Sequence, residues 1–169
     1  LRGGPESRAR PSDRPGDQVA NQRANYGTDD HFEIAASMGN LGGILASLGR
    51  YTEAESVFVQ VRSTLGRMAG SDHAFYGGIT NQLASVVYRQ GRTDEALVLY
   101  RASLESAEKN LPPDHPGRVG ALLGLGRLLS ELGDPGAAEP LLREALAIRE
   151  RTLPADHWQI ATPTSLLAA

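Results

Sequence analysis

Every histidine in the sequence directly follows an aspartate, and these Asp-His pairs recur at one fixed interval. The pairs are Asp30-His31, Asp72-His73, Asp114-His115 and Asp156-His157, so that successive pairs lie 42 residues apart. A fixed period of about this length indicates a repeat protein, in which one supersecondary unit is stacked several times. The spacing of the pairs therefore constrains the fold more strongly than their chemistry does.

Three copies of the unit align without insertion or deletion when residues 31–72 are laid over 73–114 and 115–156. Glycine, alanine and leucine recur at matching positions of the copies. The aligned sets are Gly49, Gly91 and Gly133; Ala54, Ala96 and Ala138; and Leu41, Leu83 and Leu125. Glycine is typical of a chain reversal, whereas alanine is typical of a place where two helices approach closely.

Each copy contains two apolar stretches with helical spacing, one before and one after the aligned glycine. In the third copy, the first stretch places on one helix face Leu122, Leu125, Leu128, Leu129 and Leu132. The second stretch places on one face Leu141, Leu142, Ala145, Leu146 and Ile148, with Arg143, Glu144, Arg149 and Glu150 toward water. We therefore predict that each copy folds as two helices joined at the glycine.

The segments that begin at the aligned glycines resemble a known family. They are "GRYTEAESVF", "GRTDEALVLYRASL" and "GDPGAAEPLLREALAIRERTLPADH", and they are similar to tetratricopeptide repeats of the long variety found in kinesin light chains and many bacterial regulatory proteins. The resemblance covers about residues 30–169. It implies an all-α, right-handed superhelical solenoid of antiparallel helix hairpins, with three full repeats and the first helix of a fourth.

We expect two segments of different character along the chain. Residues 1–28 hold several prolines and glycines among five arginines, with little hydrophobic periodicity, which predicts a disordered linker. Residues 29–169 are expected to form the solenoid. Its repeats are placed at about 31–72, 73–114 and 115–156, and a partial repeat at 157–169.

The position of each Asp-His pair, just before a predicted first helix, suggests a role in starting that helix. The aspartate carboxylate can accept backbone N–H groups that the first helical turn leaves unpaired, and Pro116 suits that first turn. Neighbouring copies on one edge of a helical stack are roughly 10 Å apart, whereas the ligands of one zinc ion lie about 2 Å from it. We therefore expect the aspartates to cap helices, and we expect no metal site.

Composition and motifs argue against several classes of function. A net charge of −3 and a pI near 5.8 give no basic surface for nucleic acid, and no apolar run approaches the roughly 18 residues that span a bilayer. Cysteine is absent, and neither H-E-x-x-H nor G-x-S-x-G occurs. The glycines of "GRVGALLGLGR" lack the lysine-serine pair of a phosphate loop. We expect no catalytic residues, no cofactor, and neither nucleic acid nor a membrane as partner.

The family resemblance also implies a binding surface, because first helices of successive repeats line a concave groove in these solenoids. Counting from the aligned glycines places in that groove Asn40, Asn81, Gln82, Ser85, Tyr88, Arg89, Leu123 and Arg127, beside Gly43. Amide side chains can bond a peptide backbone, and the two arginines favour carboxylates, so we expect a protein or peptide ligand with acidic character. The alternative is that these polar residues are merely solvated.

One activity of the family is not implied by the sequence. A subclass binds the carboxylate terminus of chaperones through a basic clamp, but the corresponding positions here carry Gly39, Gly43, Gln82, Gly120 and Gly124.

The functional hypothesis is a non-catalytic protein-protein interaction module, excerpted from a larger regulatory protein. The sequence contains one lysine, Lys109, and sixteen arginines. This bias indicates a GC-rich coding source and, with the resemblance, a bacterial protein. Two alternatives are a sensor or docking arm of a serine/threonine kinase or NTPase signalling protein, and a structural self-association spacer. A cytoplasmic location is expected, and the oligomeric state is left open.

Overall fold

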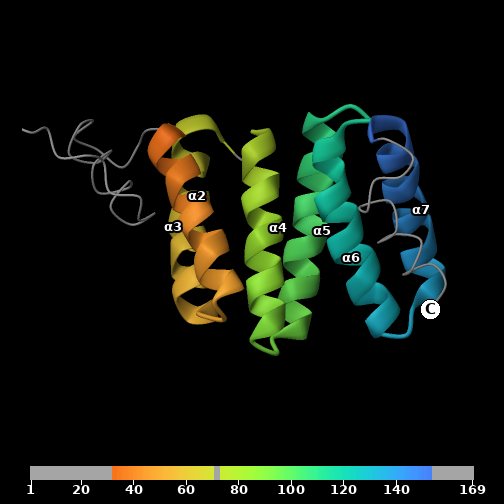
Figure 1. Cartoon of the computed structure of the whole chain (residues 1–169), viewed down its shortest axis with the longest axis horizontal. Coiled ribbons are helices and arrows are strands. Elements are labelled where there is room, and N and C mark those ends of the chain that lie inside the picture. The colour runs from red at the N-terminus through yellow and green to blue at the C-terminus, as the bar shows by residue number, and fades with distance from the viewer. Residues whose placement is uncertain (1–31, 71–72, 154–169) are drawn as a thin grey trace, which may run out of the picture.

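The computed structural model describes residues 32–70 and 73–153, and within these ranges the chain contains helices and no strands. The elements are α2 (Phe32–Ser47), α3 (Tyr51–Ala69), α4 (Ala74–Arg89), α5 (Thr93–Asn110), the short 3-10 helix η1 (Pro116–Arg118), α6 (Val119–Glu131) and α7 (Pro135–Thr152). The α-helices pack as three consecutive antiparallel hairpins in one row (Figure 1). This arrangement confirms the predicted all-α solenoid of helix hairpins. The predicted linker 1–28 and the partial repeat 157–169 lie outside the described residues.

The turn inside each hairpin is made at the aligned glycine. Gly49, Gly91 and Gly133 have φ angles of 75°, 81° and 79°, a left-handed conformation that glycine adopts without steric cost. In the first hairpin, the backbone N–H of Gly49 bonds to the carbonyl of Ala46 (3.0 Å), and that of Arg50 bonds to the carbonyl of Leu45 (2.9 Å). These bonds satisfy carbonyl groups at the end of α2, and the predicted chain reversal is confirmed.

Close packing of the hairpins depends on pairing a small residue with a large one. Ala54, Ala96 and Ala138 are buried in all three repeats. A Cβ atom added at Gly42 would lie 2.7 Å from the ring of Phe58, so that helices α2 and α3 touch at a site where only glycine fits. Leu132, which the sequence placed on the buried face of α6, is half exposed because α6 ends one residue earlier.

The core runs through the whole row of helices and is mainly aliphatic. Its largest buried side chains include Phe58, Tyr100 and Leu142, which occupy the same position of the three repeats and are each 1% exposed. Each such burial contributes roughly 1.5–3 kcal/mol of hydrophobic free energy. Tyr100 is therefore a core residue.

At the two Asp-His pairs whose histidines the structure describes, the capping role assigned to the aspartate is wrong, because the histidine caps the helix. The pairs at 30–31 and 156–157 lie outside the described residues. The Nδ1 atom of His73 accepts the backbone N–H of Phe75 (3.2 Å), and Nδ1 of His115 accepts that of Gly117 (3.0 Å). Both histidines occupy the residue before the helix, and Nδ1 lies as many bonds from the backbone as an aspartate oxygen does. Asp114 instead forms an ion pair with Arg151 (2.7 Å).

The predicted position of the Asp-His pairs at helix starts is confirmed for two copies, because His73 directly precedes α4 and His115 directly precedes η1. Pro116 lies in the first turn of η1, as expected. No three histidine, aspartate or glutamate side chains in ranges 32–70 and 73–153 are grouped to hold a metal ion. No helix in those ranges is both long enough and apolar enough to cross a membrane.

Candidate peptide-binding groove

Helices α4 and α6 are the first helices of adjacent repeats. They contact each other, and both also pack against α5. A depression of about 270 Å³ follows this contact. Its walls are Asn81, Gln82 and Ser85 of α4 and Gly120, Leu123, Gly124 and Arg127 of α6, and Tyr100 of α5 contributes to its lining. We call this depression the α4–α6 groove. Five residues that the sequence assigned to a binding surface meet in it.

The glycines of α6 allow side chains of α4 and α5 to pack closely against it. A Cβ atom at Gly124 would overlap the ring of Tyr100 and lie 2.8 Å from Oδ1 of Asn81, so that no other residue fits without displacing its neighbours. The Oδ1 atom of Asn81 is buried and has no hydrogen-bond partner among the described residues. A buried acceptor of this kind is rare in folded proteins, and this one lies at the floor of the groove.

One end of the groove carries a cluster of three polar residues, Tyr88, Arg127 and Glu131. The guanidinium carbon of Arg127 lies 5.9 Å from the centre of the Tyr88 ring, and its Nε lies 3.7 Å from Oε1 of Glu131. The Tyr88 hydroxyl donates a hydrogen bond to Oε2 of Glu131. That hydrogen bond raises the pKa of Tyr88 above its ordinary value, against the opposing effect of the positive charges on Arg127 and Arg89.

A second depression, of about 390 Å³, adjoins the groove toward the N-terminal ends of the same two helices. Asn81 and Gly120 line both depressions, so the two are continuous along the helix pair. The second is lined mostly by apolar and glycine residues, among them Phe75 and Leu111, with the capping residues His73 and His115 also in its wall. Sequence reasoning did not anticipate it.

The remaining predicted residues lie near the groove or apart from it. Tyr88 belongs to the polar cluster at its end, and Arg89 is exposed at the last position of α4. Asn40 is exposed on α2, and like Gly43 it does not line the α4–α6 groove. Sequence reasoning missed Glu131, although its spacing of four residues from Arg127 is typical of an ion pair on one helix face.

The comparison with protein families agrees with the geometry. The sequence profile of the tetratricopeptide repeat matches residues 34–74 and again residues 77–151. The chain therefore belongs to the tetratricopeptide repeat family. Repeats of this family form protein-protein interaction scaffolds, and this class of protein is typically non-catalytic.

Solved structures with the same architecture include repeats of kinesin light chain type. The chain is 25% identical to the TPR-like repeats of a candidate kinesin light chain from Podosopora anserina, with a TM-score of 0.67, and the match covers 90% of this chain and 72% of that one. A single-substitution form of those repeats gives a TM-score of 0.69 with the same identity and coverage. BtubC (BKLC) from P. vanneervenii is 20% identical, with a TM-score of 0.68 over 85% of this chain and 61% of that one. No curated protein sequence matches the chain.

Proposed function

We propose that the chain is an interaction module that binds an extended, acidic peptide segment in the α4–α6 groove. The observation that carries this proposal is the groove itself. It brings amide, hydroxyl and guanidinium groups from two adjacent repeats to one surface.

The α4 wall supplies groups suited to a peptide backbone. Gln82 carries an exposed amide that can both donate and accept, Ser85 adds a hydroxyl about one helical turn further on, and Asn81 lines the same wall. These features favour recognition of the peptide main chain with little dependence on its sequence.

Charge supplies the selectivity in this proposal. Arg127 lies in the groove and Arg89 is close enough for its charge to act on Tyr88, so two guanidinium groups flank one end of the binding surface. Guanidinium groups pair well with carboxylates, and such pairs at an exposed surface weaken as salt rises. A shallow groove and a flexible ligand give an expected affinity around micromolar, or about −8 kcal/mol.

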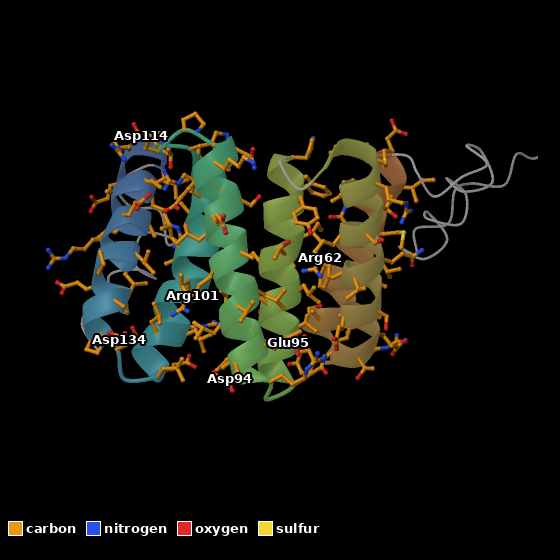
Figure 2. All side chains as sticks on the ribbon, turned by 180° about the vertical axis from the view of Figure 1, so that it is seen from behind. Arg62, Asp94, Glu95, Arg101, Asp114 and Asp134 are labelled. Carbon is orange, nitrogen blue, oxygen red and sulfur yellow. The ribbon has the colours of Figure 1, made fainter. Side chains whose placement is uncertain are left out.

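The experiment is a peptide-array screen in which acidic, basic and neutral apolar peptides compete, followed by affinity measurements on variants. We expect acidic peptides to bind best, Arg127→Ala and Arg89→Ala each to weaken them, and higher salt to weaken them further. Arg101→Ala is the matched control, because Arg101 is an exposed arginine of α5 that does not line the groove (Figure 2). It removes the same charge and should leave binding unchanged.

Three results would count against the proposal. Preference for basic or purely apolar peptides would exclude the charge selectivity. Equal weakening by Arg101→Ala and Arg127→Ala would show that net charge, and not the groove, attracts the ligand. If no peptide binds and the chain associates with itself as its concentration rises in sedimentation measurements, the self-association spacer is the better description.

A further inference from the structure

The polar cluster at the end of the α4–α6 groove already contains a bound carboxylate. Each oxygen of the Glu131 carboxylate has its own partner: Oε1 faces Nε of Arg127 on α6, and Oε2 accepts the hydroxyl of Tyr88 on α4. We infer that Tyr88 and Arg127 form a carboxylate-binding site that Glu131 occupies in the free protein, an inference that rests on the proposed function. An acidic ligand displaces Glu131 from it.

Local helix energetics do not account for a glutamate at this position. Glu131 is the last residue of α6, where the helix dipole disfavours a negative charge. The pair also has the less favourable order, with the arginine four residues before the glutamate. On α7 the corresponding pair, Glu139 and Arg143, has the favourable order and lies in the first half of its helix. What holds Glu131 in place is its contact across the groove with Tyr88.

Displacement of Glu131 requires no rearrangement of the core. The side chain of Arg127 is 36% exposed, so a ligand can reach it. The side chain of Glu131 is 43% exposed, so it can turn into solvent when it leaves Arg127. Exposed ion pairs of this kind are weak, and competition from Glu131 lowers the affinity for a carboxylate by only about two- to five-fold. A neutral peptide cannot replace the ion pair, so Glu131 makes the site selective for ligands that bring a negative charge.

The direct test compares Glu131→Gln with the wild-type chain. The probe is a fluorescent Gly/Ser peptide with a central run of glutamates, and its counterpart carries glutamines. We expect the variant to bind the glutamate peptide about two- to five-fold more tightly and the glutamine peptide with unchanged affinity. Glu139→Gln is the matched control, because it removes the same charge from an exposed pair of the same spacing outside the groove.

A double-mutant cycle separates local competition from a change in net charge. If Glu131 acts through Arg127, then Glu131→Gln has no effect on binding when Arg127 is already alanine. The inference is overturned if the gain persists in the Arg127→Ala background, if Glu139→Gln gives the same gain, or if Glu131→Gln leaves binding of the glutamate peptide unchanged or weaker.

A measurement without any peptide distinguishes this inference from the proposed function. N-acetylglutamate amide, which carries one side-chain carboxylate, is titrated while the side-chain Nε–H signal of Arg127 is followed by NMR. We expect a saturable shift at lower concentration in Glu131→Gln than in the wild type, and a pKa of Tyr88 that moves back toward its ordinary value. If acidic peptides fail to bind any variant but this shift appears, the proposed function fails and the carboxylate site stands. If no such shift appears in Glu131→Gln, the site is wrong.

Discussion

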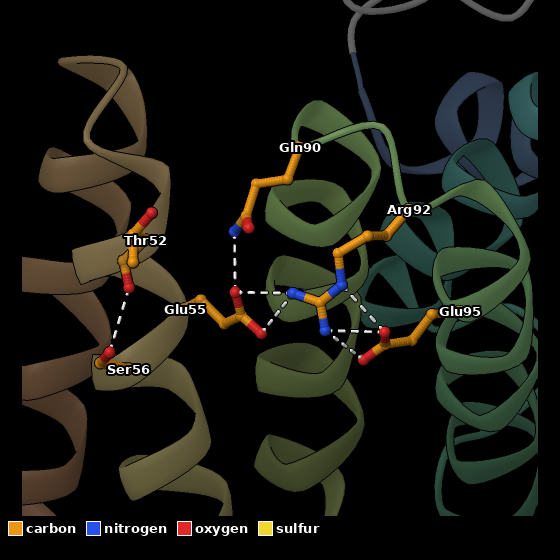
Figure 3. A network of polar contacts seen from close by, with 6 residues as sticks. All are labelled: Thr52, Glu55, Ser56, Gln90, Arg92 and Glu95. Atoms are coloured by element: carbon orange, nitrogen blue, oxygen red, sulfur yellow. Dashed lines mark hydrogen bonds and ion pairs between the residues drawn. The ribbon is translucent and has the colours of Figure 1, made fainter.

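The polar contacts near the two junctions between repeats lie at opposite edges of the stack. At the first junction, between α3 and α4, Glu55 accepts hydrogen bonds from Gln90 (2.8 Å) and Arg92 (2.8 Å), beside the turns inside the hairpins (Figure 3). At the second, between α5 and α6, Arg118 of η1 reaches Glu108 of α5 (3.7 Å) across the junction and also pairs with Glu144 of α7 in its own repeat (2.9 Å), beside the linker between repeats. Figure 2 shows these two edges, with Glu95 at one and Asp114 at the other.

The sequence explains why neither set of contacts is repeated. The position of Glu55 is occupied in the next repeat by Leu97, and that of Arg92 by Asp134, so the first ion pair has no second copy. Asp134 instead caps α7 by accepting the backbone N–H of Ala137 (3.0 Å). In a similar way, the position of Arg118 is occupied by Tyr76 in the preceding repeat. Apolar positions thus follow the period, whereas these polar contacts near the junctions do not.

The junctions also differ in their contact with solvent. The side chain of Arg118 is 8% exposed, while that of Arg92 is 41% exposed. Solvent screens an exposed pair strongly, and breaking a buried one leaves charges that have lost their partner. We therefore expect the second junction to be the more sensitive to substitution.

The largest effect is expected for Arg118→Ala. The change removes a buried side chain and leaves Glu108 and Glu144 without their shared cation, but both carboxylates are partly exposed, which moderates the cost. We expect the free energy of unfolding to fall by about 2 kcal/mol, below the roughly 3–5 kcal/mol of a fully buried pair. Denaturant unfolding followed by circular dichroism measures this change.

Arg118→Met is the control for the charge itself. Methionine fills similar space without a charge, and Nε of Arg118 is buried without a partner among the described residues. Hydrophobic replacement of a buried ion pair is often close to neutral, so the loss should be under about 1 kcal/mol. A loss as large as that of Arg118→Ala would show that the ion pairs themselves hold the second junction.

A smaller effect, with opposite signs at the two junctions, is expected for glycine-to-alanine changes. At the second junction, the new Cβ of Gly124→Ala would overlap the buried ring of Tyr100, whereas at the first, that of Gly66→Ala would lie 3.7 Å from Tyr76. Overpacking costs about 1–3 kcal/mol, and alanine gains up to about 1 kcal/mol over glycine in a helix. We expect Gly124→Ala to destabilise and Gly66→Ala to stabilise. Thermal unfolding of both variants tests the signs, and stabilisation by Gly124→Ala would contradict the packing seen at α5 and α6.

Most of the fold could be predicted because it depends on features that repeat. The turn glycines and the buried alanines recur at fixed positions, and each follows from local geometry or close packing. The helix cap was assigned to the wrong residue because aspartate is the commoner cap and the sequence does not show which member of an Asp-His pair takes the capping position. A rule based on residue type alone does not predict that Nδ1 of His115 caps the helix.

The candidate groove could be predicted only in part. Counting from the glycines found Asn81, Gln82 and Arg127, because groove positions follow the helical period. Counting could not show that Tyr88 and Glu131, 43 residues apart in the sequence, would bond across two repeats. Such contacts depend on how far one repeat is rotated against the next, which single helices do not determine.

The smallest effect is expected at the first junction, for Glu55→Gln. Partial burial works to raise the pKa of Glu55, but the hydrogen bonds from Arg92 and Gln90 outweigh it, so the pKa is lowered in the folded state. A carboxyl with a lowered pKa stabilises the fold above its unfolded-state pKa, and this contribution is lost as pH falls through the folded-state pKa. At neutral pH we expect the variant to melt only about 1–2 °C below the wild type.

The dependence on pH identifies the cause of this small difference. In acid, protonation of Glu55 removes the charge that the variant already lacks, so the melting temperatures of Glu55→Gln and the wild type should converge. Glu150→Gln is the control, because Glu150 is an exposed glutamate of α7. This variant removes the same charge from an exposed position and so measures the effect of net charge alone. A gap for Glu55→Gln that persists in acid would mean that the amide disturbs packing at the first junction, and the ion pair with Arg92 would then not be what stabilises it.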